Sequence, residues 1–399
     1  MLHFFRKPYV YCVTFSLALT LLLTWSLLTI FIIPKEIEVP EEEFETIDLS
    51  QFTKPQESTT AGDPFFVVTI PPTIEPDEPD EPDDSHEPDD SREPTILPEE
   101  TSPDIETSPG TDTDIDTGVN TDKETDTETE TEAETETEGE TFSPEDYPII
   151  TDNMYLDENI YINITTVRRF DSDFHVAEIK IRDPQYLKTA LAKDTYGLNI
   201  KEKTSVQAQR VGAILAINGD FYGANEKGYV IRNGVILRKT LRPTDDKRRK
   251  YFEDLAILWD GSFFPFDEQT TSIDDLKAMG AVQVFGFGPT LLKNGQIMVD
   301  AKTEVGVSNP NGNPRTAICY MGECHYLFVV ADGRSDRSKG PTLLELAKVL
   351  QELGAVTAYN LDGGGSATMY FNGKLVNNPC ANWNVPQERE VSDIVYIGY

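Results

Sequence analysis

Histidine and cysteine are scarce in this chain, which has four of each among its 399 residues. The sequence contains no Ser-His-Asp motif, no His-rich metal pattern and no Gly-x-x-x-x-Gly-Lys phosphate loop. His175 and His325 stand in apolar, strand-like surroundings that are typical of core or surface histidines. These absences disfavour a phosphodiesterase that cleaves a phosphorus–oxygen bond on a metal cluster rich in His and Asp.

The positions of the four cysteines do not determine whether any disulfide bond forms. Cys12 lies in an apolar run near the N-terminus, and Cys380 has no evident partner in the sequence. Cys319 and Cys324 flank four residues that read as a hairpin turn. A cross-strand disulfide between them and two separate thiols are both open.

Basic charge is the other scarcity, with 34 Lys and Arg against 70 Asp and Glu. The imbalance belongs to one segment, because residues 35–146 hold 39 acidic and 4 basic side chains. Residues 147–399 hold 31 acidic and 28 basic residues and are nearly neutral. Without a basic surplus to neutralise phosphates, nucleic acid is not an expected partner.

Residues 9–33 form an apolar run without a charged side chain. A bilayer-spanning helix needs ~20 apolar residues, and a signal-peptide core is usually ~7–15 residues long. The run therefore predicts an uncleaved membrane anchor. Arg6 and Lys7 precede it and acidic residues follow, so we expect residues 1–34 to be a cytoplasmic tip with a single-pass anchor and the C-terminal domain to be extracellular.

Residues 35–146 are dominated by Pro-Asp/Glu repeats and a Thr-Glu tract, with few aromatic residues. Such a segment has too little apolar surface to offset the entropy of folding, and like charges keep it extended. We expect a disordered acidic stalk between the anchor and a catalytic domain at residues 147–399, which is long enough for one core.

The sequence of this domain contains turn signals typical of a β-rich fold. Four dipeptides that favour tight hairpins separate short apolar runs, at 233–234, 260–261, 294–295 and 372–373. Start signals predict helices at 183–196, 204–212 and 343–353, the last two with capping boxes. The stripe at positions 343, 346, 347, 350 and 353 marks a core-facing helix. The expected fold class is α+β, with a hairpin-rich mixed or antiparallel sheet and a few packed helices.

Polar residues follow several apolar, strand-like segments, and strand ends are where a rigid scaffold commonly aims functional groups at one cleft. Ala213–Ile217 runs into Asn218-Gly219-Asp220, and Tyr326–Val330 runs into Ala331-Asp332-Gly333-Arg334. The recurrence of this pattern favours a functional site over ordinary turns.

The run Asn360-Leu361-Asp362-Gly363-Gly364-Gly365-Ser366 is the strongest local signal. Three adjacent glycines are costly to order, so they indicate positive φ angles or close backbone approach. Free amides in such a turn can form an anion-binding nest beside the carboxylate. A tight turn with a capping Asp remains the alternative.

Together these segments resemble the phosphodiester glycosidase family, over about Lys203 to the C-terminus. The resemblance rests on motifs in this order: Asn218–Phe221, Asn313–Ala317, Asp332–Arg334, the Glu345–Ala347 helix, Asn360–Ser366, Asn378-Pro379 and Glu388–Asp393. Cys380 departs from the family, in which a serine is expected after Asn-Pro. The resemblance implies a glycoside hydrolase that acts on glycosyl phosphodiesters.

The reaction implied by the resemblance breaks the bond between an anomeric carbon and a phosphate oxygen. It requires carboxylates that support an oxocarbenium-like transition state or deliver water, and the candidates are Asp362, Asp332 and Asp220. The candidates for binding the phosphate are Arg315, Arg334, Ser366 and the amides of Gly363, Gly364 and Gly365. Asn218, Asn360 and Thr368 are candidates for the sugar. The residue pattern requires no cofactor and leaves a divalent cation open.

The sequence thus predicts an extracytoplasmic enzyme that cleaves a glycosyl-1-phosphodiester in a surface polysaccharide or glycolipid. Two alternatives are a non-catalytic domain that binds anionic glycans and a phosphodiesterase that cleaves the P–O bond. Glycosidase stereochemistry follows from the separation of two carboxyls, which the sequence leaves open.

Overall fold

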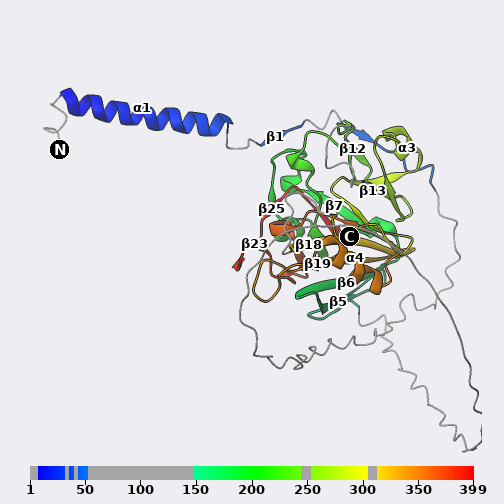
Figure 1. The fold of residues 1–399 in the computed structure, drawn as a ribbon. Helices are drawn as coiled ribbons and strands as arrows, with labels where there is room; N and C mark the ends of the chain where they lie inside the picture. Colours follow the sequence, from blue (N-terminus) through cyan, green and yellow to red (C-terminus); the bar gives the residue numbers. More distant parts are fainter. Residues whose placement is uncertain (1–7, 32–35, 40–43, 53–146, 244–252, 304–311) are drawn as a thin grey trace, which may run out of the picture. The chain divides into compact units, whose positions relative to one another are not determined.

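The structure, a computed structural model, describes residues 8–31, 36–39, 44–52, 147–243, 253–303 and 312–399. Residues 53–146, most of the acidic stalk predicted at 35–146, lie outside the described residues. Among the described residues, all the paired strands run antiparallel. The domain is mainly β-sheet with few helices, which confirms the α+β expectation in its coarse form (Figure 1).

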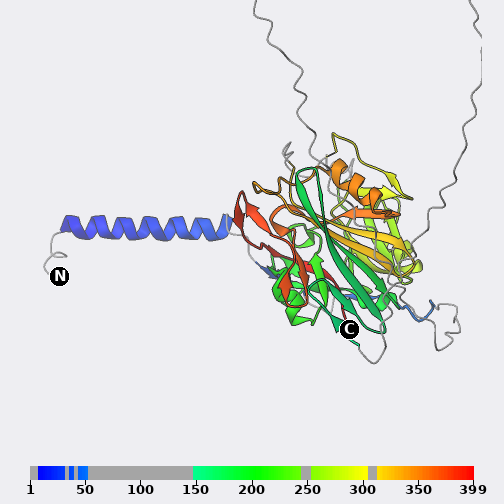
Figure 2. The same cartoon turned by 90° about the horizontal axis from the view of Figure 1, so that it is seen from below.

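The largest sheet has nine strands, and Figure 2 shows its long pair β5–β6 in teal. In spatial order the strands are β17 (Gln296–Ile297), β16 (Thr290–Lys293), β20 (Thr357–Asn360), β18 (Arg315–Gly322), β19 (His325–Ala331), β6 (Ser172–Ile181), β5 (Ile160–Arg169), β4 (Met154–Leu156) and β3 (Ile149–Ile150).

Two smaller sheets complete the framework. The six-stranded sheet runs β14 (Phe263–Phe266), β13 (Asp254–Leu258), β15 (Ala281–Phe285), β11 (Val230–Arg232), β12 (Val235–Arg238) and β2 (Glu45–Thr46). The five-stranded sheet runs β22 (Lys374–Leu375), β21 (Met369–Phe371), β10 (Leu215–Asn218), β26 (Asp393–Ile397) and β7 (Leu187–Leu191). Two-stranded pairs join β1 (Ile37–Glu38) to β8 (Gly197–Leu198), β23 (Cys380–Asn382) to β24 (Val385–Pro386), and β25 (Glu390–Val391) to β9 (Glu202–Lys203).

Two apolar clusters lie on opposite faces of the nine-stranded sheet. One joins side chains such as Ile179 and Phe328 to Leu215 of β10 and Leu255 of β13, so it holds the three sheets together. The other packs Val329 and neighbouring sheet residues against α4 (Leu343–Glu352). Alternation along each strand supplies both faces, since successive side chains point to opposite sides.

The hairpin predictions are confirmed. The dipeptides at 233–234, 260–261, 294–295 and 372–373 connect β11 to β12, β13 to β14, β16 to β17 and β21 to β22. In three of these turns the Asn as well as the Gly has a positive φ angle. These backbone angles are the ones that two-residue hairpin turns require, which is why Asn-Gly is such a strong local signal.

The last predicted helix is also confirmed. The Thr342 hydroxyl accepts from the Glu345 amide, and the Glu345 carboxylate accepts from the Thr342 amide, so the capping box forms as expected. A second helix, α2 (Thr204–Arg210), forms where it was expected, but without its capping box. Its Gln207 side chain instead donates to Glu202 and Val391 carbonyls. The third helix, α3 (Ile273–Ala278), was not expected from the sequence.

The helix predicted over 183–196 is wrong. Asp183 does accept from the Gln185 amide, but only a short 3-10 turn follows at Pro184–Tyr186. Residues 187–191 then form β7, because this segment pairs along its whole length with β26. A ladder to a distant strand outweighs local helix propensity here.

Residues 44–52 lie on the domain rather than in the predicted stalk. Glu45 and Thr46 pair with β12, and Ile47 is buried in an apolar cluster with Ile231 and Ile236. Phe52 stacks on Trp259 with ring centroids 5.5 Å apart. The predicted catalytic domain, which begins at residue 147, therefore leaves out a segment that forms the edge of the six-stranded sheet.

The apolar N-terminal run forms a continuous helix, α1 (Pro8–Phe31). In the part of the chain that the structure describes, no helix meets the length and hydropathy that a membrane span requires.

No disulfide joins Cys319 to Cys324, both of which the structure describes. Cys319 pairs with Leu327 across β18 and β19, whereas Cys324 lies in the turn between these strands. Their side chains belong to the clusters on opposite faces of the sheet, which explains why the spacing does not produce a bridge.

Candidate active-site cleft

Several of the predicted polar strand ends meet at one edge of the nine-stranded sheet. Arg315 begins β18, Ala331 ends β19 opposite it, and Asn360 ends β20 beside Ala317. The antiparallel register alone brings these positions together. The amide of Asp362 then donates to the Gly219 carbonyl at 3.3 Å, which joins this edge to the end of β10.

A cleft of about 530 Å³ opens beside this junction. It contains two of the three predicted carboxylates, Asp220 and Asp362, together with Ser366. The remaining lining residues come mostly from β9, β25 and the segment between β24 and β25: Lys201, Lys203, Phe221, Ala381, Gln387, Glu388, Arg389, Glu390, Val391 and Ser392.

Asp362 is a buried acid of the cleft whose carboxyl has a shifted pKa. Its Oδ2 atom accepts from Ser366 Oγ at 2.6 Å and from Arg389 Nη2 at 3.0 Å. Burial raises the pKa of the Asp362 carboxyl, and the Arg389 charge and the Ser366 hydrogen bond oppose that rise. A carboxyl held between these influences is suited to exchange a proton in a reaction.

Asp220 is held by two backbone amides and one ion pair. Its Oδ1 accepts from the Tyr222 amide at 2.9 Å and lies 3.0 Å from Arg232 Nη2, and its Oδ2 accepts from the Gly286 amide at 2.8 Å. This set of contacts fixes the carboxylate plane. Asp220 is therefore a preorganised negative charge at the wall of the cleft.

Arg232 joins Asp220 to a second buried carboxylate. Its Nε donates to Asp393 Oδ2 at 2.8 Å, and its guanidinium lies 4.5 Å from the Phe285 ring centroid. Burial raises the pKa of Asp393, with Arg232 opposing and Asp220 adding to the rise. One cation thus serves two carboxylates, and removing it would leave both of them buried without their cationic partner.

A second buried charge cluster adjoins the first through the backbone of one residue, Gly286. Arg242 Nη2 donates to the Gly286 carbonyl at 3.0 Å, while the Gly286 amide binds Asp220. Arg242 Nη1 also lies 2.7 Å from Asp254 Oδ1 and 3.9 Å from Glu268 Oε1. A Cβ on Gly286 would stand 2.0 Å from Arg242 Nη2, so a larger residue here would displace that guanidinium.

The three glycines after Asp362 serve close packing more than anion binding. The Gly364 amide donates to the Pro314 carbonyl at 2.8 Å, so it is not free to form the predicted nest. A Cβ on Gly363 would lie 2.7 Å from that same carbonyl oxygen, and one on Gly365 would lie 2.9 Å from Ala381 Cα. Gly364 also has a φ angle of 60°. The glycines therefore let the Asp362 loop lie directly on two backbone segments.

The three predicted sugar-binding residues lie beneath the cleft and are fully buried. Asn218 Nδ2 donates to the Asp362 carbonyl at 2.6 Å, and its Oδ1 accepts from Thr316 Oγ1 at 2.8 Å and from the Thr368 amide at 3.2 Å. Asn360 Nδ2 donates to the Gly288 carbonyl at 2.7 Å. None of the three is among the residues that line the cleft. The Asn218 side chain holds the Asp362 loop, whereas the buried Asn360 Oδ1 and Thr368 Oγ1 have no hydrogen-bond partner among the described residues.

The two predicted phosphate-binding arginines lie behind the glycine loop. Arg315 is buried and donates through Nε to the Pro341 carbonyl at 3.2 Å. Arg334 donates through Nη1 to the Ala381 carbonyl at 2.7 Å and through Nε and Nη2 to Asn313 Oδ1. Burial lowers the pKa of Arg334, with further lowering from the nearby Arg389 and Arg315 charges. The structure therefore gathers three arginines around this loop.

Asp332 lies apart from the other two acids. It accepts through Oδ1 from Asn377 Nδ2 and from the Asn378 amide, each at 3.0 Å, and its Oδ2 lies 3.3 Å from His175 Nε2. It is not among the residues that line the cleft. Its contacts tie β19 to the loop after β22.

Arg389, Lys201 and Lys203 are cleft residues that the sequence did not identify as functional. Arg389 belongs to a motif used for the family resemblance, and this was the only signal that pointed to it. Lys203 ends the short strand β9 and Lys201 directly precedes that strand, and no motif marks either lysine. Neither lysine forms an ion pair with a described residue, so both leave positive charge at the cleft.

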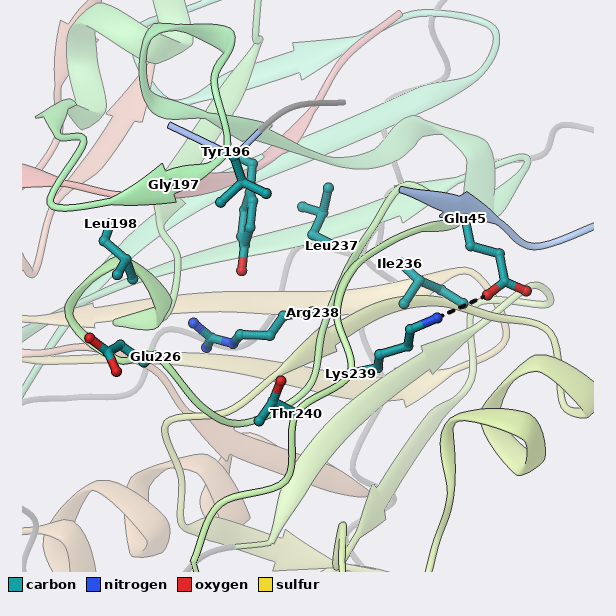
Figure 3. Close-up of a pocket in the computed structure, with 11 residues that line it drawn as sticks. Glu45, Tyr196, Gly197, Leu198, Glu226, Ile236, Leu237, Arg238, Lys239 and Thr240 are labelled. Carbon is teal, nitrogen blue, oxygen red and sulfur yellow. Dashed lines mark ion pairs between the residues drawn. The ribbon is translucent and has the colours of Figure 1, made fainter. Parts of the chain in front are cut away.

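A separate pocket of about 300 Å³ lies under the N-terminal segment and contains none of the predicted site residues (Figure 3). Figure 3 shows the Tyr196 hydroxyl directed toward Arg238 and the ion pair between Lys239 and Glu45, at 3.7 Å. Tyr196 stacks on Tyr222, the residue whose amide binds Asp220. Tyr196 therefore links this pocket to a residue that helps to hold Asp220. Among the described residues, no group of three or more His, Cys, Asp or Glu side chains could hold a metal ion.

Comparisons with known proteins agree with the motifs. Residues 211–398 match the family model described as phosphodiester glycosidase, which confirms the resemblance. The SPbeta prophage-derived uncharacterized protein YomE of Bacillus subtilis (strain 168) is 24% identical over 267 residues, which are 62% of this chain and 40% of that protein. N-acetylglucosamine-1-phosphodiester alpha-N-acetylglucosaminidase of Mus musculus is 34% identical over 123 residues, which are 27% of this chain and 23% of the enzyme.

Solved structures resemble the chain more distantly. The zebrafish N-acetylglucosamine-1-phosphodiester alpha-N-acetylglucosaminidase catalytic domain, auto-inhibited by its pro-peptide, matches with a TM-score of 0.46 and 23% identity. That match covers 60% of this chain and 83% of the zebrafish chain. The present chain thus spans less than half the length of the curated relatives named above.

Proposed function

We propose that this chain, whose residues 211–398 form a domain of the phosphodiester glycosidase family, hydrolyses the bond between the anomeric carbon of a sugar and the phosphate oxygen of a phosphodiester. The names of the mammalian relatives favour an N-acetylglucosamine-1-phosphodiester as substrate. The observation that carries the proposal is the buried Asp362 carboxyl, bound by Ser366 and Arg389 in the same cleft as Asp220.

The two acids suit the two tasks of a glycosidase. The raised pKa of Asp362 suits it to donate or accept a proton. Asp220, bound by Arg232 and two amides, would stabilise positive charge as the sugar becomes oxocarbenium-like. The phosphodiester is a fair leaving group, so the demand on an acid is smaller than for an ordinary glycoside.

The phosphate of the substrate would meet the cations of the cleft. Arg389 binds Asp362 through Nη2 and Ser366 through Nε, and its side chain remains 44% exposed. Lys203 of β9 and Lys201, which directly precedes β9, line the same cleft. A planar guanidinium suits two phosphate oxygens at once, whereas each lysine adds a mobile point charge.

Location and natural substrate are part of the proposal. The charge-free run at 9–33, with Arg6 and Lys7 before it, favours an N-terminus in the cytoplasm and a domain outside the cell membrane. There the substrate would be a glycosyl phosphodiester of a surface polysaccharide or glycolipid. Digestion of intact cells with an added protease would test this, since an extracellular domain is cleaved and an internal one is protected.

The activity test uses the full chain, because residues 44–52 pack on the domain. The protein is incubated with the methyl diester of N-acetylglucosamine-1-phosphate in ¹⁸O-labelled water. Free sugar with the label on its anomeric hydroxyl, and no such product from Asp362→Asn, supports glycosidic cleavage. Anomeric configuration is read in the same experiment by NMR before mutarotation.

Two outcomes would overturn the proposal. Label on the phosphate means that the P–O bond is cleaved and that the chain is a phosphodiesterase. Tight binding of the diester without release of either product means that the domain is a binder of anionic glycans.

A further inference from the structure

Two exposed aromatic side chains stand at the tips of neighbouring hairpins. Phe170 lies in the turn between β5 and β6 and is 41% exposed, and Trp383 lies in the turn between β23 and β24 and is 51% exposed. Both line one surface hollow of about 700 Å³, with Lys339, Thr342 and Glu345 among its other walls. Exposed apolar side chains gathered inside a polar rim mark binding surfaces.

Phe170 occupies a backbone conformation that suits it poorly. Its φ angle is 48° and that of Asp171 is 52°, so both central residues of the turn are left-handed. Asn and Gly adopt this conformation at little cost, whereas a bulky side chain is a rare occupant. An exposed phenyl ring held in a strained turn points to a role for the ring itself.

Trp383 is presented by a hairpin that is fixed on both sides. Arg334 donates through Nη1 to the Ala381 carbonyl at 2.7 Å, and its own carbonyl accepts from the Asn384 amide at 2.8 Å. Asn384 Nδ2 also donates to Asp336 Oδ2 at 2.8 Å. The indole is thus exposed on an ordered support, which lowers the entropy lost when a ligand binds to it.

The hollow and the cleft share this hairpin. Ala381 lines the cleft and packs against Gly365, whereas Trp383, two residues on, lines the hollow. In an extended strand two residues span roughly 7 Å. Arg334 lies between the two sites, because it binds Ala381 on the cleft side and Asn313, the neighbour of Gly312, on the hollow side.

We propose that Phe170 and Trp383 form a subsite for a sugar ring of the substrate beyond the phosphodiester that is cleaved, and that the substrate is therefore a chain of several sugars. This inference rests on the proposed function, because it takes the cleft to be the place of cleavage. The face of an aromatic ring carries negative charge density, which attracts the C–H bonds on the flat face of a sugar. Lys339, Thr342 and Glu345 supply polar groups for its hydroxyls.

The test compares a short and a long substrate of the same chemistry. The short one is the methyl diester of N-acetylglucosamine-1-phosphate, and the long one is an oligomer of N-acetylglucosamine-1-phosphate repeats. Trp383→Ala is expected to raise KM for the oligomer by about fivefold to tenfold, with KM for the methyl diester and both kcat values unchanged. Trp383→Phe should restore part of the affinity. Val385→Ala is the matched control, since Val385 is 48% exposed on the same hairpin but does not line the hollow.

Phe170→Asn separates binding from folding. Asn suits the left-handed turn, so the unfolding temperature should stay equal or rise while KM for the oligomer increases. Equal losses on both substrates, or no loss on the oligomer in either variant, would overturn the subsite.

Binding of the oligomer to Asp362→Asn protein, measured by titration calorimetry, distinguishes failure of the two proposals. If the wild-type chain hydrolyses neither substrate but oligomer binding depends on Trp383, the subsite stands and the proposed reaction fails. If oligomer binding is the same with and without Trp383, the subsite fails whatever the reaction.

Discussion

Arg389 Nη2 lies 3.0 Å from Asp362 Oδ2, so a half-exposed cation of the cleft contacts a buried acid of the candidate site. The two residues are brought together by the glycine loop on one side and by the segment before β25 on the other. This contact opposes the effect of burial on Asp362 and leaves the rest of the guanidinium at the cleft, where an anionic substrate can reach it.

Asp362→Asn is expected to lower kcat for the methyl diester by roughly 10²–10⁴-fold, because the amide can neither donate nor accept the proton. The amide oxygen can still accept from Ser366 and Arg389, so the unfolding temperature should change little. Asp152→Asn is the control, since the Asp152 side chain is 94% exposed and pairs with Lys374 at the surface. Near-full activity in Asp362→Asn would remove this residue from the chemistry.

Arg389→Gln removes the charge that lowers the pKa of Asp362, so this pKa rises. If Asp362 acts as an acid, the basic limb of the kcat/KM profile moves to higher pH. If it acts as a base or nucleophile, the acidic limb moves to higher pH. Rate profiles from pH 3 to 10 therefore assign the role. Arg337→Gln is the control, since Arg337 pairs with Asp173 outside the cleft. A profile with neither limb displaced would contradict the coupling.

The buried Asp254 makes stability depend on pH. Burial raises the pKa of its carboxyl to about 7, with Arg242 opposing and Glu268 adding to the rise. The unfolded value is near 3.9, so the folded state holds the proton more tightly. The stabilisation is complete below about pH 4 and is lost as the pH rises to about 7.

Asp254→Asn should therefore flatten the decrease in free energy of unfolding between pH 5 and pH 8. Urea unfolding at several pH values measures this, with Asp152→Asn as the exposed control. A variant that keeps the wild-type slope would place the titrating proton on another group.

The N-terminal segment should contribute to the stability of the domain. A chain that begins at residue 53 loses the β2–β12 pairing and the Phe52–Trp259 stack, so its unfolding temperature should fall by several degrees relative to one that begins at residue 36. In the longer chain, Ile47→Ala should cost about 2 kcal/mol, because Ile47 is buried against Ile231 and Ile236. Leu241→Ala, at an exposed position, is the control. Equal unfolding temperatures would mean that the segment only lies on the surface.

Some of the fold could be predicted because its causes are local. The four hairpin dipeptides work through backbone angles that Asn and Gly adopt readily, and the Thr342–Glu345 box closes within one helical turn. Residues 187–191 could not be predicted in this way. Their conformation is decided by pairing with β26, about two hundred residues along the chain.

The same division applies to the candidate site. Sequence motifs identified Asp220 and Asp362, and both lie in the cleft. A motif of the same kind contains Asp332, but in the folded chain its carboxylate binds Asn377 and Asn378. Arg232 gave no signal, since its two carboxylate partners stand next to it only after β11, β10 and β26 have assembled.

By itself, then, the sequence determined the turns, the long α4 helix and the ordered motifs that match the family model, because these depend on neighbouring residues or on a preserved order of segments. Only the tertiary structure decided which carboxylates share a cleft, that the Gly364 amide donates to the Pro314 carbonyl, and that Arg389 contacts Asp362. These outcomes depend on burial and on hydrogen bonds between segments far apart in the chain, and neither exists until the sheets have packed.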